Sequence, residues 1–273
     1  MTSGRIAFLG AGNMARSLVG GLIDHGTAAA TLIAADPDAA QRDAMQKIGI
    51  AATASNAEAV AGAATIVLAV KPQMMRTVVR DLAASLTPQQ LLISIAAGVP
   101  TGAIASWCGQ ATGIVRCMPN TPALYGAGMT VLYANDRVTP QQRAAAESTL
   151  AAVGRVLWTS DEGSLDAVTA LSGSGPAYFF YLMEAMIEAG VALGLDAATA
   201  RALTLQTATG AALMADRSEL PPAQLRRNVT SPGGTTESAV ATLDRQSVRD
   251  AIVAAIRAAA VRSAELAHEF GGD

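Results

Sequence analysis

The segment that follows the first apolar run has small residues at the spacing of a dinucleotide-binding loop. After Arg5–Leu9 the chain reads Gly10-Ala11-Gly12-Asn13-Met14-Ala15. In such a loop the first glycine permits a tight turn and the second lets the backbone approach a pyrophosphate. The third small residue lets the next helix pack on the strand, and the N–H groups of that helix attract phosphates. We therefore predict that Leu9 to Ala15 bind a dinucleotide, the alternative being a glycine turn without a nucleotide.

Asp36 ends the second apolar run, Thr31–Ala35, where an acidic side chain usually meets the adenosine ribose of a dinucleotide. A carboxylate that faces the ribose accepts hydrogen bonds from its hydroxyls and repels a 2′-phosphate. This interpretation predicts that NADH serves at least as well as NADPH. In the alternative, Asp36 only caps a helix beginning at Pro37, and Arg42 is then free to hold the phosphate.

Two further segments follow apolar runs and so belong at the carboxyl ends of strands, where open α/β sheets bind ligands. The first is Ala69-Val70-Lys71-Pro72, and Lys71 is one of two lysines in the chain. We predict that these four residues contact the dinucleotide, against the alternative of a solvated lysine before a helix that Pro72 starts. The second is Arg116–Ala123, in which Asn120 offers hydrogen bonds beside the expected nicotinamide, against the alternative of a rigid turn.

The second half of the chain has one segment rich in glycine and hydroxyl residues, Val229–Thr236. Gly233 and Gly234 expose backbone N–H groups, and a helix starts directly afterwards, so the loop can bind a carboxylate. A plain connection between helices would not need this density of small polar residues. By contrast, we interpret Ser172–Pro176 as a break between two helices that caps the second.

The second half also lacks the groups that move protons in most dehydrogenases. It has no lysine, no cysteine and one histidine, His268, near the chain end. Reduction of a keto acid generally needs a lysine or histidine to protonate the developing alkoxide. The absence points to an acceptor that arrives already activated, such as a protonated C=N bond.

The elements that must position these residues change in kind near residue 160. Before it, β-rich apolar runs alternate with helical segments, which predicts a mainly parallel, doubly wound sheet covered on both faces. The runs are Arg5–Leu9, Thr31–Ala35, Ala64–Val70, Leu91–Ile95, Gly113–Cys117 and Met129–Tyr133. We predict a Rossmann domain over residues 1–160 and an all-helical domain over residues 161–273.

Helix signals cover the second domain. We predict helices from Pro176 to Gly194, from a cap at Asp196 to Asp216, and from a Ser247/Asp250 capping box to Phe270. The first of these is apolar on most of its circumference. A domain of this size has too little interior to hide several such helices, so we expect a partner chain to cover them. The alternative is one helix threaded through the domain centre.

Composition limits the class of protein. Apolar residues make up 51% of the 273 residues and charged ones 15%, which excludes a disordered chain. No apolar run approaches the roughly 18 residues of a membrane span, and the start lacks the pattern of a secretory signal. The two cysteines form no disulfide framework, and no cluster has the spacing of a metal site. We expect a soluble cytoplasmic protein.

The charge balance does not favour a nucleic-acid partner. The net charge is −3, from 19 basic and 22 acidic residues. Residues 1–160 hold 11 basic and 8 acidic groups, and residues 161–273 hold 8 and 14, so the net charges are +3 and −6. A mildly positive first half suits an anionic ligand such as a dinucleotide, although chance asymmetry explains it equally well.

In order and content these motifs resemble the pyrroline-5-carboxylate reductase family over nearly the whole chain. The resemblance rests on the glycine-rich loop, Ala69–Pro72, Arg116–Ala123, Ser172–Tyr178 and Val229–Thr236. It implies a Rossmann domain, a helical domain that interleaves with its twin in a homodimer, sometimes assembled further, and NAD(P)H-dependent reduction of 1-pyrroline-5-carboxylate to L-proline.

The resemblance also implies roles for particular residues. It implies a dinucleotide-binding site formed by Leu9–Ala15, Asp36, Asn56, Ala69–Pro72 and Asn228 of a neighbouring chain. It also implies that the substrate carboxylate is bound by Ser231, Gly233, Gly234 and Thr235, and that Thr236 contacts the ring nitrogen. Asn120 belongs to the same predicted substrate site.

Asp36 departs from the family, which often has an uncharged residue there. Three alternatives remain: a reductase of another cyclic imino acid, a β-hydroxyacid-dehydrogenase-like enzyme that would need a lysine absent here, and a dinucleotide sensor without turnover.

Overall fold

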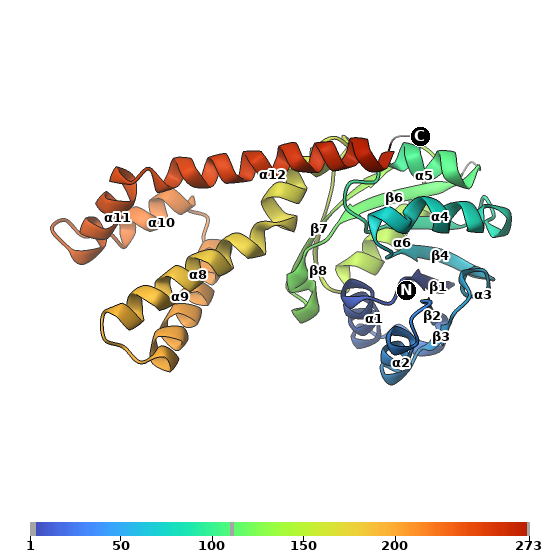
Figure 1. The fold of residues 1–273 in the computed structure, drawn as a ribbon, viewed down its shortest axis with the longest axis horizontal. Coiled ribbons are helices and arrows are strands. Elements are labelled where there is room, and N and C mark those ends of the chain that lie inside the picture. Colours follow the sequence, from blue (N-terminus) through green and yellow to red (C-terminus); the bar gives the residue numbers. More distant parts are fainter. Residues whose placement is uncertain (1–3, 110–111, 272–273) are drawn as a thin grey trace. The chain divides into compact units, whose positions relative to one another are not determined.

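The computed structural model describes residues 4–109 and 112–271, which form two compact units (Figure 1). One unit runs to Ser174 and also includes the chain from Ala259 onward, and the other is Gly175–Ala258. The predicted change from strands to helices near residue 160 agrees with the structure, because the last strand of the described chain ends at Trp158. The compact units divide one helix later, after Ser174.

The first unit is built on one eight-stranded sheet with the order β3-β2-β1-β4-β5-β6-β7-β8. All neighbouring strands are parallel except β6 and β7. The strands are β1 Arg5–Leu9, β2 Leu32–Ala35, β3 Ala51–Thr53, β4 Ala63–Leu68, β5 Leu91–Ser94, β6 Gly113–Met118, β7 Gly128–Ala134 and β8 Gly154–Trp158. The six predicted strands and the doubly wound Rossmann class are confirmed. The two strands that the sequence did not predict, β3 and β8, are the edge strands of the sheet.

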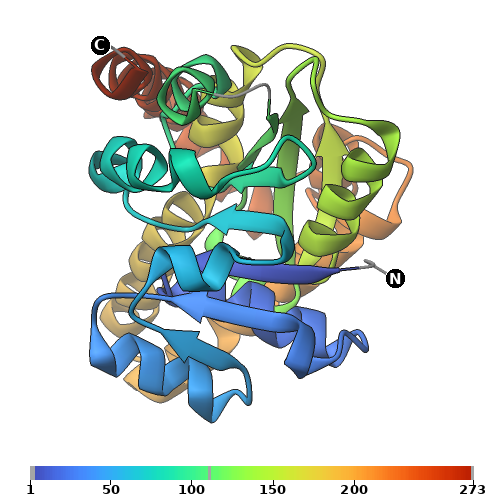
Figure 2. The same ribbon diagram turned by 90° about the vertical axis from the view of Figure 1, so that its right-hand side faces the viewer.

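Helices cover both faces of this sheet (Figure 2). The helices of this unit are α1 Asn13–Asp24, α2 Ala39–Lys47, α3 Asn56–Val60, α4 Pro72–Leu82, α5 Thr101–Cys108, α6 Pro140–Ala151 and α7 Ser164–Val168, with short 3-10 turns at Ala29–Thr31, Ala83–Ser85 and Thr121–Tyr125. Buried side chains of α1, α2 and α6 share one apolar cluster with the sheet, and those of α3, α4 and α5 share the other. The strand order reverses at β1, so the crevice for a ligand opens at the carboxyl ends of β1 and β4.

The second unit contains helices only. They are α8 Gly175–Ala192, α9 Ala197–Arg217, α10 Pro222–Asn228, α11 Thr235–Arg245 and the first part of α12 Val248–Gly271. The predicted cap at Asp196 is confirmed, since its carboxylate accepts the Thr199 N–H at 3.0 Å. Ser247 differs from a capping-box residue, because its φ of +52° is left-handed and its N–H closes the end of α11 on Asp244.

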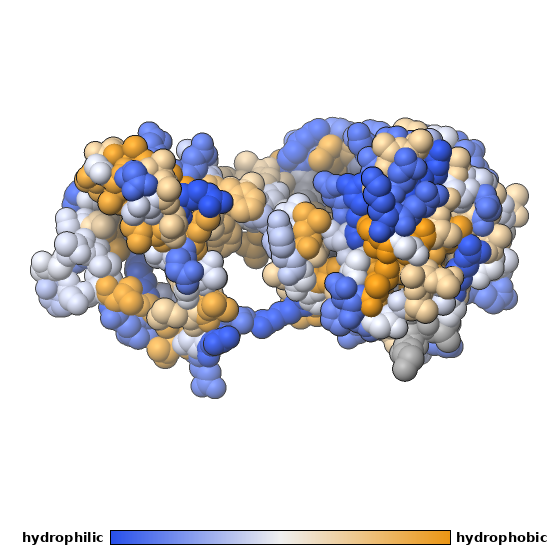
Figure 3. All heavy atoms as spheres, turned by 90° about the horizontal axis from the view of Figure 1, so that it is seen from below, coloured by the Kyte–Doolittle hydropathy of each residue, from blue (hydrophilic) through white to orange (hydrophobic). Residues whose placement is uncertain are grey.

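This helical unit has almost no interior of its own. Among residues 175–258, only Gly175, Ala200 and Thr204 are buried. Phe179 and Phe180 are each 63% exposed, so the alternative of a helix threaded through the domain centre is wrong. Apolar residues reach the surface over much of this unit, at the left of Figure 3. Such a surface is typical of chains that bury it against a partner. No helix in the described part of the chain is long and apolar enough to cross a membrane.

A buried ion pair joins three segments of the first unit. Arg116 lies near the end of β6 and is 5% exposed. Its Nη1 is 3.2 Å from Oε1 of Glu162, which precedes α7. The same carboxylate accepts the N–H of Thr101 at 2.7 Å and its hydroxyl at 2.8 Å, so it also fixes the start of α5.

Replacing Glu162 by alanine should lower the free energy of unfolding by roughly 2–3 kcal/mol, because a buried cation loses its counter-charge. The measurement is denaturant or thermal unfolding. Glu265→Ala is the control, since Glu265 pairs with Arg262 at the surface, where both side chains are more than half exposed. That change should stay within about 0.5 kcal/mol. Equal losses in the two variants would contradict the interpretation.

Candidate functional site

The glycine-rich loop passes very close to the end of β4. Gly10 has φ of +95°, and a Cβ there would lie 2.6 Å from the carbonyl oxygen of Ala69. The Gly10 N–H donates to Ala35 at 2.8 Å, which ties the loop to the end of β2. Gly12 is the N-cap of α1, with no side chain capping the helix and no atom within 4 Å of where its Cβ would be. The first turn of α1 is therefore open to a phosphate group.

Asp36 faces this loop. Its Oδ2 accepts the N–H of Ala11 at 2.8 Å, and its Oδ1 accepts the N–H of Asp38 at 2.9 Å. The helix that follows begins at Ala39, and its N-cap is Asp38, which accepts the Ala40 N–H. The alternative that Asp36 merely caps a helix from Pro37 is therefore wrong: a proline and another aspartate separate it from the helix.

Arg42 lies beside Asp36, but its guanidinium is bonded to main-chain carbonyls and not to the Asp36 carboxylate. One Nη1 atom donates to the main-chain carbonyls of Asp36 and Pro37, both at 2.8 Å. The guanidinium thus fixes the turn after β2. The carboxylate of Asp36 is held beside the glycine-rich loop by the N–H groups of Ala11 and Asp38.

The other predicted cofactor residues of this unit also lie at the carboxyl edge of the sheet. Because β4 ends at Leu68, Ala69 and Val70 belong to the loop after it, and the Ala69 N–H donates to Leu9 at 2.7 Å. Lys71 is exposed and is the N-cap of α4, whose first residue is Pro72. Asn56 is the first residue of α3, after β3. The structure therefore gathers these residues along one edge, next to the glycine-rich loop.

Asn120 follows β6 at the same edge, and protein groups already engage its amide. Its Oδ1 accepts the N–H of Met129 at 2.9 Å. Its Nδ2 donates to the carbonyl oxygen and the hydroxyl of Ser172, at 3.2 and 3.3 Å. Asn120 thus ties the loop after β6 to a segment fifty-two residues away.

The predicted break between two helices in Ser172–Pro176 is confirmed at Ser174, but the helical element before it ends in an unexpected conformation. Residues Thr169–Gly173 form a π-helical turn directly after α7, closed by the Ser174 N–H on Thr169 at 2.8 Å, and α8 starts at Gly175. Only Ser174 separates the two helical elements. π-helical turns are frequent at functional sites. The local signal for this turn in the sequence is the Gly-Ser-Gly-Pro run next to it, which does not specify a π-helical conformation.

The hydroxyl-rich loop of the second unit forms a turn before α11. Gly233 has φ of +72°, and the Gly234 N–H donates to Ser231 at 3.0 Å. Gly234 is the N-cap of α11 and provides no side chain to cap it, so the N–H groups of Thr235 and Thr236 head an uncapped helix. Ser231, Thr235 and Thr236 are all exposed. This arrangement can bind a carboxylate.

Two residues near this loop have partners within the unit. The carboxylate of Glu237 accepts the Gly233 N–H at 2.7 Å and so braces the turn. Asn228, the last residue of α10, accepts a hydrogen bond from Gln224 at 2.7 Å. The predicted dinucleotide residues of the first unit and this loop thus belong to different compact units.

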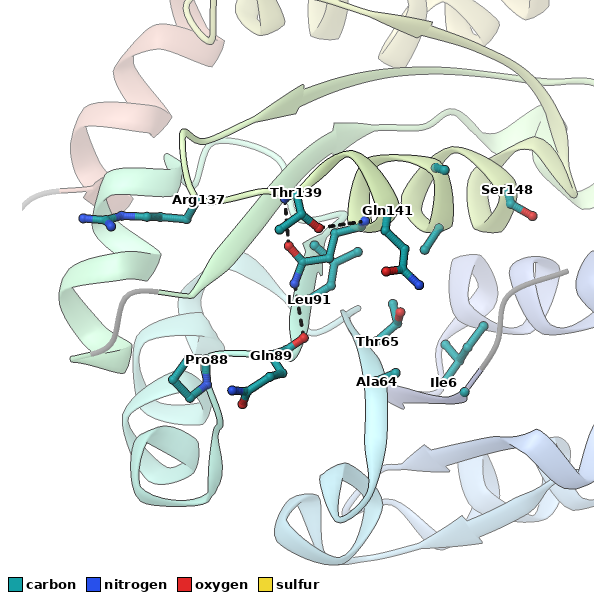
Figure 4. A pocket seen from close by; sticks show the side chains of 14 residues that line it. Ile6, Ala64, Thr65, Pro88, Gln89, Leu91, Arg137, Thr139, Gln141 and Ser148 are labelled. Carbon is teal, nitrogen blue, oxygen red and sulfur yellow. Dashed lines mark hydrogen bonds between the residues drawn. The ribbon is translucent and has the colours of Figure 1, made fainter.

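A pocket of about 710 Å³ lies elsewhere (Figure 4). Its lining includes Ile6, Thr65 and Leu91, at the amino ends of β1, β4 and β5, together with Gln141 and Ser148 of α6. None of the predicted site residues lines it, and it is at the edge of the sheet opposite to the ligand crevice. Among the described residues, no group of three or more His, Cys, Asp or Glu side chains could hold a metal ion.

Cys117 is fully buried in β6, and burial raises the pKa of its thiol far above the usual range. A thiol that stays protonated is no nucleophile. Cys117 therefore acts as a small buried hydrophobic residue.

Comparisons with known proteins match both parts of the chain. A family model of NADP oxidoreductases dependent on coenzyme F420 matches residues 5–98. A family model of pyrroline-5-carboxylate reductase dimerisation matches residues 162–266. A pyrroline-5-carboxylate reductase of Pseudomonas aeruginosa is 53% identical over 272 residues, which cover 99% of this chain and all of that protein.

Solved structures agree. A pyrroline-5-carboxylate reductase of Coxiella burnetii superimposes with a TM-score of 0.91 at 44% identity, covering 97% of this chain and 99% of that one. A pyrroline carboxylate reductase of Plasmodium falciparum, solved with NADP bound, gives a TM-score of 0.89 at 30% identity, covering 98% and 99%.

The fold and the crevice define the chain as an oxidoreductase with a nicotinamide dinucleotide cofactor bound by a Rossmann domain. Identity over the full length, together with the dimerisation region, specifies the family. The chain belongs to the pyrroline-5-carboxylate reductase family.

Replacing Asp36 by serine should raise kcat/KM for NADPH relative to NADH by tenfold or more. The 2′-phosphate brings about two negative charges near the carboxylate, a repulsion of several kcal/mol at an effective dielectric near 20. Steady-state kinetics with both cofactors measures the ratio.

The matched control is Asp38→Ser, because Asp38 caps α2 and serine caps a helix nearly as well. Its cofactor ratio should hardly move. An unchanged ratio in Asp36→Ser, or a wild-type enzyme with a strong preference for NADPH, would refute the assignment.

Proposed function

We propose that the chain reduces 1-pyrroline-5-carboxylate to L-proline in the cytoplasm, with NADH at least as effective as NADPH. Hydride passes from the nicotinamide ring to the imine carbon, and the substrate binds as the iminium ion. The C=N π electrons then become the lone pair of the ring nitrogen, so the product leaves as an amine that solvent protonates. The observation that carries the proposal is the uncapped, hydroxyl-rich start of α11 in a chain with a Rossmann crevice.

The loop before α11 suits the carboxylate of this substrate. The N–H groups of Gly234, Thr235 and Thr236 and the hydroxyl of Ser231 are the candidate donors, and Gly233 gives the loop its left-handed turn. A helix N-terminus adds a favourable field for an anion. Since the Gly234 N–H donates to Ser231 within the turn, Thr235 and Thr236 are the donors best placed to bind a ligand.

Thr236 is the proposed catalytic residue. Its hydroxyl would accept a hydrogen bond from the iminium N–H and orient the ring toward the nicotinamide. The chemistry then needs no lysine or histidine from the helical half, since the acceptor already carries its proton. Catalysis comes mainly from holding donor and acceptor in near-attack geometry.

On the cofactor side, the first turn of α1 and the loop Leu9–Ala15 take the pyrophosphate. Asp36 takes the adenosine ribose, and Asn56 and Ala69–Pro72 hold the remainder of the dinucleotide. The helical unit pairs with that of a second copy in a homodimer, which further assembly can extend, and Asn228 of the neighbouring chain reaches the cofactor. The exposed apolar surface of that unit supports this assembly.

The deciding experiment follows NADH oxidation with 1-pyrroline-5-carboxylate, a six-membered cyclic imino acid and a 2-keto acid. The proposal requires the five-membered imine to have the highest kcat/KM. Preference for the six-membered ring or for the keto acid would identify one of the other enzymes. Binding of NADH without turnover of any of the three would identify a sensor.

Thr236→Val should lower kcat/KM for the imine more than tenfold and leave the affinity for NADH nearly unchanged. The isosteric change removes one hydrogen bond to a charged group, worth about 1.5–3 kcal/mol. Thr242→Val on the same helix is the control, because the Thr242 hydroxyl bonds only within its helix, to Ser238 and Arg245. Wild-type kinetics in Thr236→Val would remove Thr236 from the mechanism.

Phe180→Glu should yield a monomer or an insoluble chain, because it places a charge on an apolar helix face that a partner covers. Light scattering at micromolar concentration measures the assembly. Glu184→Gln, on the same helix, should keep the wild-type mass. A well-folded wild-type monomer would overturn the proposed assembly.

A further inference from the structure

The segment after β6 docks on the π-helical turn through two neighbouring contacts. A Cβ on Gly173 would lie 2.3 Å from Cε of Met118, so this methionine fills the space that a side chain would need. Two residues on, the Asn120 amide donates to the carbonyl and hydroxyl oxygens of Ser172. The π-helical turn is therefore attached to the carboxyl edge of the sheet at β6.

Pro176 removes one of the helical donors that the Ser172 carbonyl could otherwise use. In an α-helix the carbonyl of Ser172 would accept the N–H of the residue four positions later. That residue is Pro176, which has no N–H, so the usual donor is missing. Asn120 supplies a side-chain N–H at 3.2 Å to the same carbonyl oxygen. Asn120 thus provides a donor that Pro176, fifty-six positions later in the sequence, lacks.

This contact lies on the nicotinamide side of the crevice. The adenosine ribose belongs near Asp36, after β2, so the other end of a dinucleotide extends past β1 toward β4, β5 and β6. The 3-10 turn Thr121–Tyr125 that follows Asn120 packs on α1, since Ala123 shares an apolar cluster with Ala15 and Leu18. Displacement of the loop after β6 would therefore alter the site where hydride leaves the cofactor.

We infer that Asn120 is a positioning residue for hydride transfer rather than a ligand of the substrate. Its amide fixes the π-helical turn to β6 and thereby fixes the wall beside the nicotinamide ring. Its oxygen is bonded to Met129 and its nitrogen to Ser172, so both ends of the amide serve the scaffold. This assignment rests on the proposed function, because it concerns the same reaction.

The test is Asn120→Asp, which separates the two ends of the amide. An ionised carboxylate still accepts the Met129 N–H, but it has no hydrogen for the Ser172 carbonyl and repels that oxygen. A protonated carboxyl group restores a donor of almost the same shape. The variant should therefore have kcat at least tenfold below wild type at pH 8, with the KM for the imine and the affinity for NADH within about threefold.

The pH dependence identifies the lost donor. A carboxyl group that gains its hydrogen as the pH falls should raise the ratio of variant to wild-type kcat severalfold between pH 8 and pH 5.5. The protonation of the substrate itself is common to both enzymes and cancels in the ratio. The Ser172 carbonyl oxygen, 3.2 Å from the Asn120 nitrogen, would repel an ionised carboxylate at that position and so favours its protonated form.

Asn135 provides a matched control. Its Oδ1 accepts the Ile114 N–H at 3.1 Å and its Nδ2 donates to the Thr112 carbonyl at 3.3 Å, so it is the same kind of tie between β6 and β7 at the other end of β6. Asn135→Asp should lower Tm but leave kcat at the wild-type value. Ser172→Ala, which keeps the carbonyl acceptor, should retain most of the activity.

The outcomes are distinct. Loss of Tm alone in both asparagine variants, or a higher KM with unchanged kcat in Asn120→Asp, would overturn the inference. If the wild-type chain does not reduce the imine, the proposed function is wrong. Hydrogen exchange then tests the contact between Asn120 and Ser172 independently of activity. Asn120→Asp should speed exchange of the Ser174 N–H, which closes the π-helical turn, at pH 8 and less so at pH 5.5. Unchanged exchange would refute the tie.

Discussion

The close passage of Gly10 beside Ala69 is the constraint on which the rest of the cofactor site depends. A Cβ at Gly10 would fall 2.6 Å from the Ala69 carbonyl, so only glycine lets β1 turn into α1 while β4 ends beside it. This packing brings the first turn of α1 to the crevice and leaves it uncapped for a phosphate. Asp36, directly after β2, accepts the Ala11 N–H of the same loop and so ties the loop to the end of that strand.

The helical unit, unlike the tightly packed cofactor site, has very few buried residues of its own. Its helices are apolar, but only three of its residues are buried within one chain. The hydrophobic effect acts on this unit only when another surface covers it. The match of this part of the chain to a dimerisation family model agrees with an exposed apolar surface that a second chain can cover.

Within the first unit, polar side chains tie the carboxyl edge of the sheet to the segment that follows β8. Arg116 and Glu162 connect β6 to the chain before α7, and Asn120 connects the loop after β6 to the π-helical turn. Each tie buries polar groups, and each satisfies them by partners from a distant segment. Such ties fix one geometry, because a displaced partner leaves a buried group unsatisfied.

The sequence by itself determined the Rossmann class, the six inner strands and the residues of both loops, because periodicity and glycine spacing are local properties of the chain. It did not predict the edge strands β3 and β8, which have no fully buried residue and therefore lack the continuous apolar run of the inner strands. It left open whether Asp36 caps the next helix, and only the fold excluded that alternative, because Asp38 is the cap and Asp36 accepts the N–H of Ala11, twenty-five residues away. The contact at the π-helical turn likewise depends on the fold. Pro176 lacks an N–H donor, which the sequence shows locally, but only the tertiary structure brings the Asn120 amide to the Ser172 carbonyl.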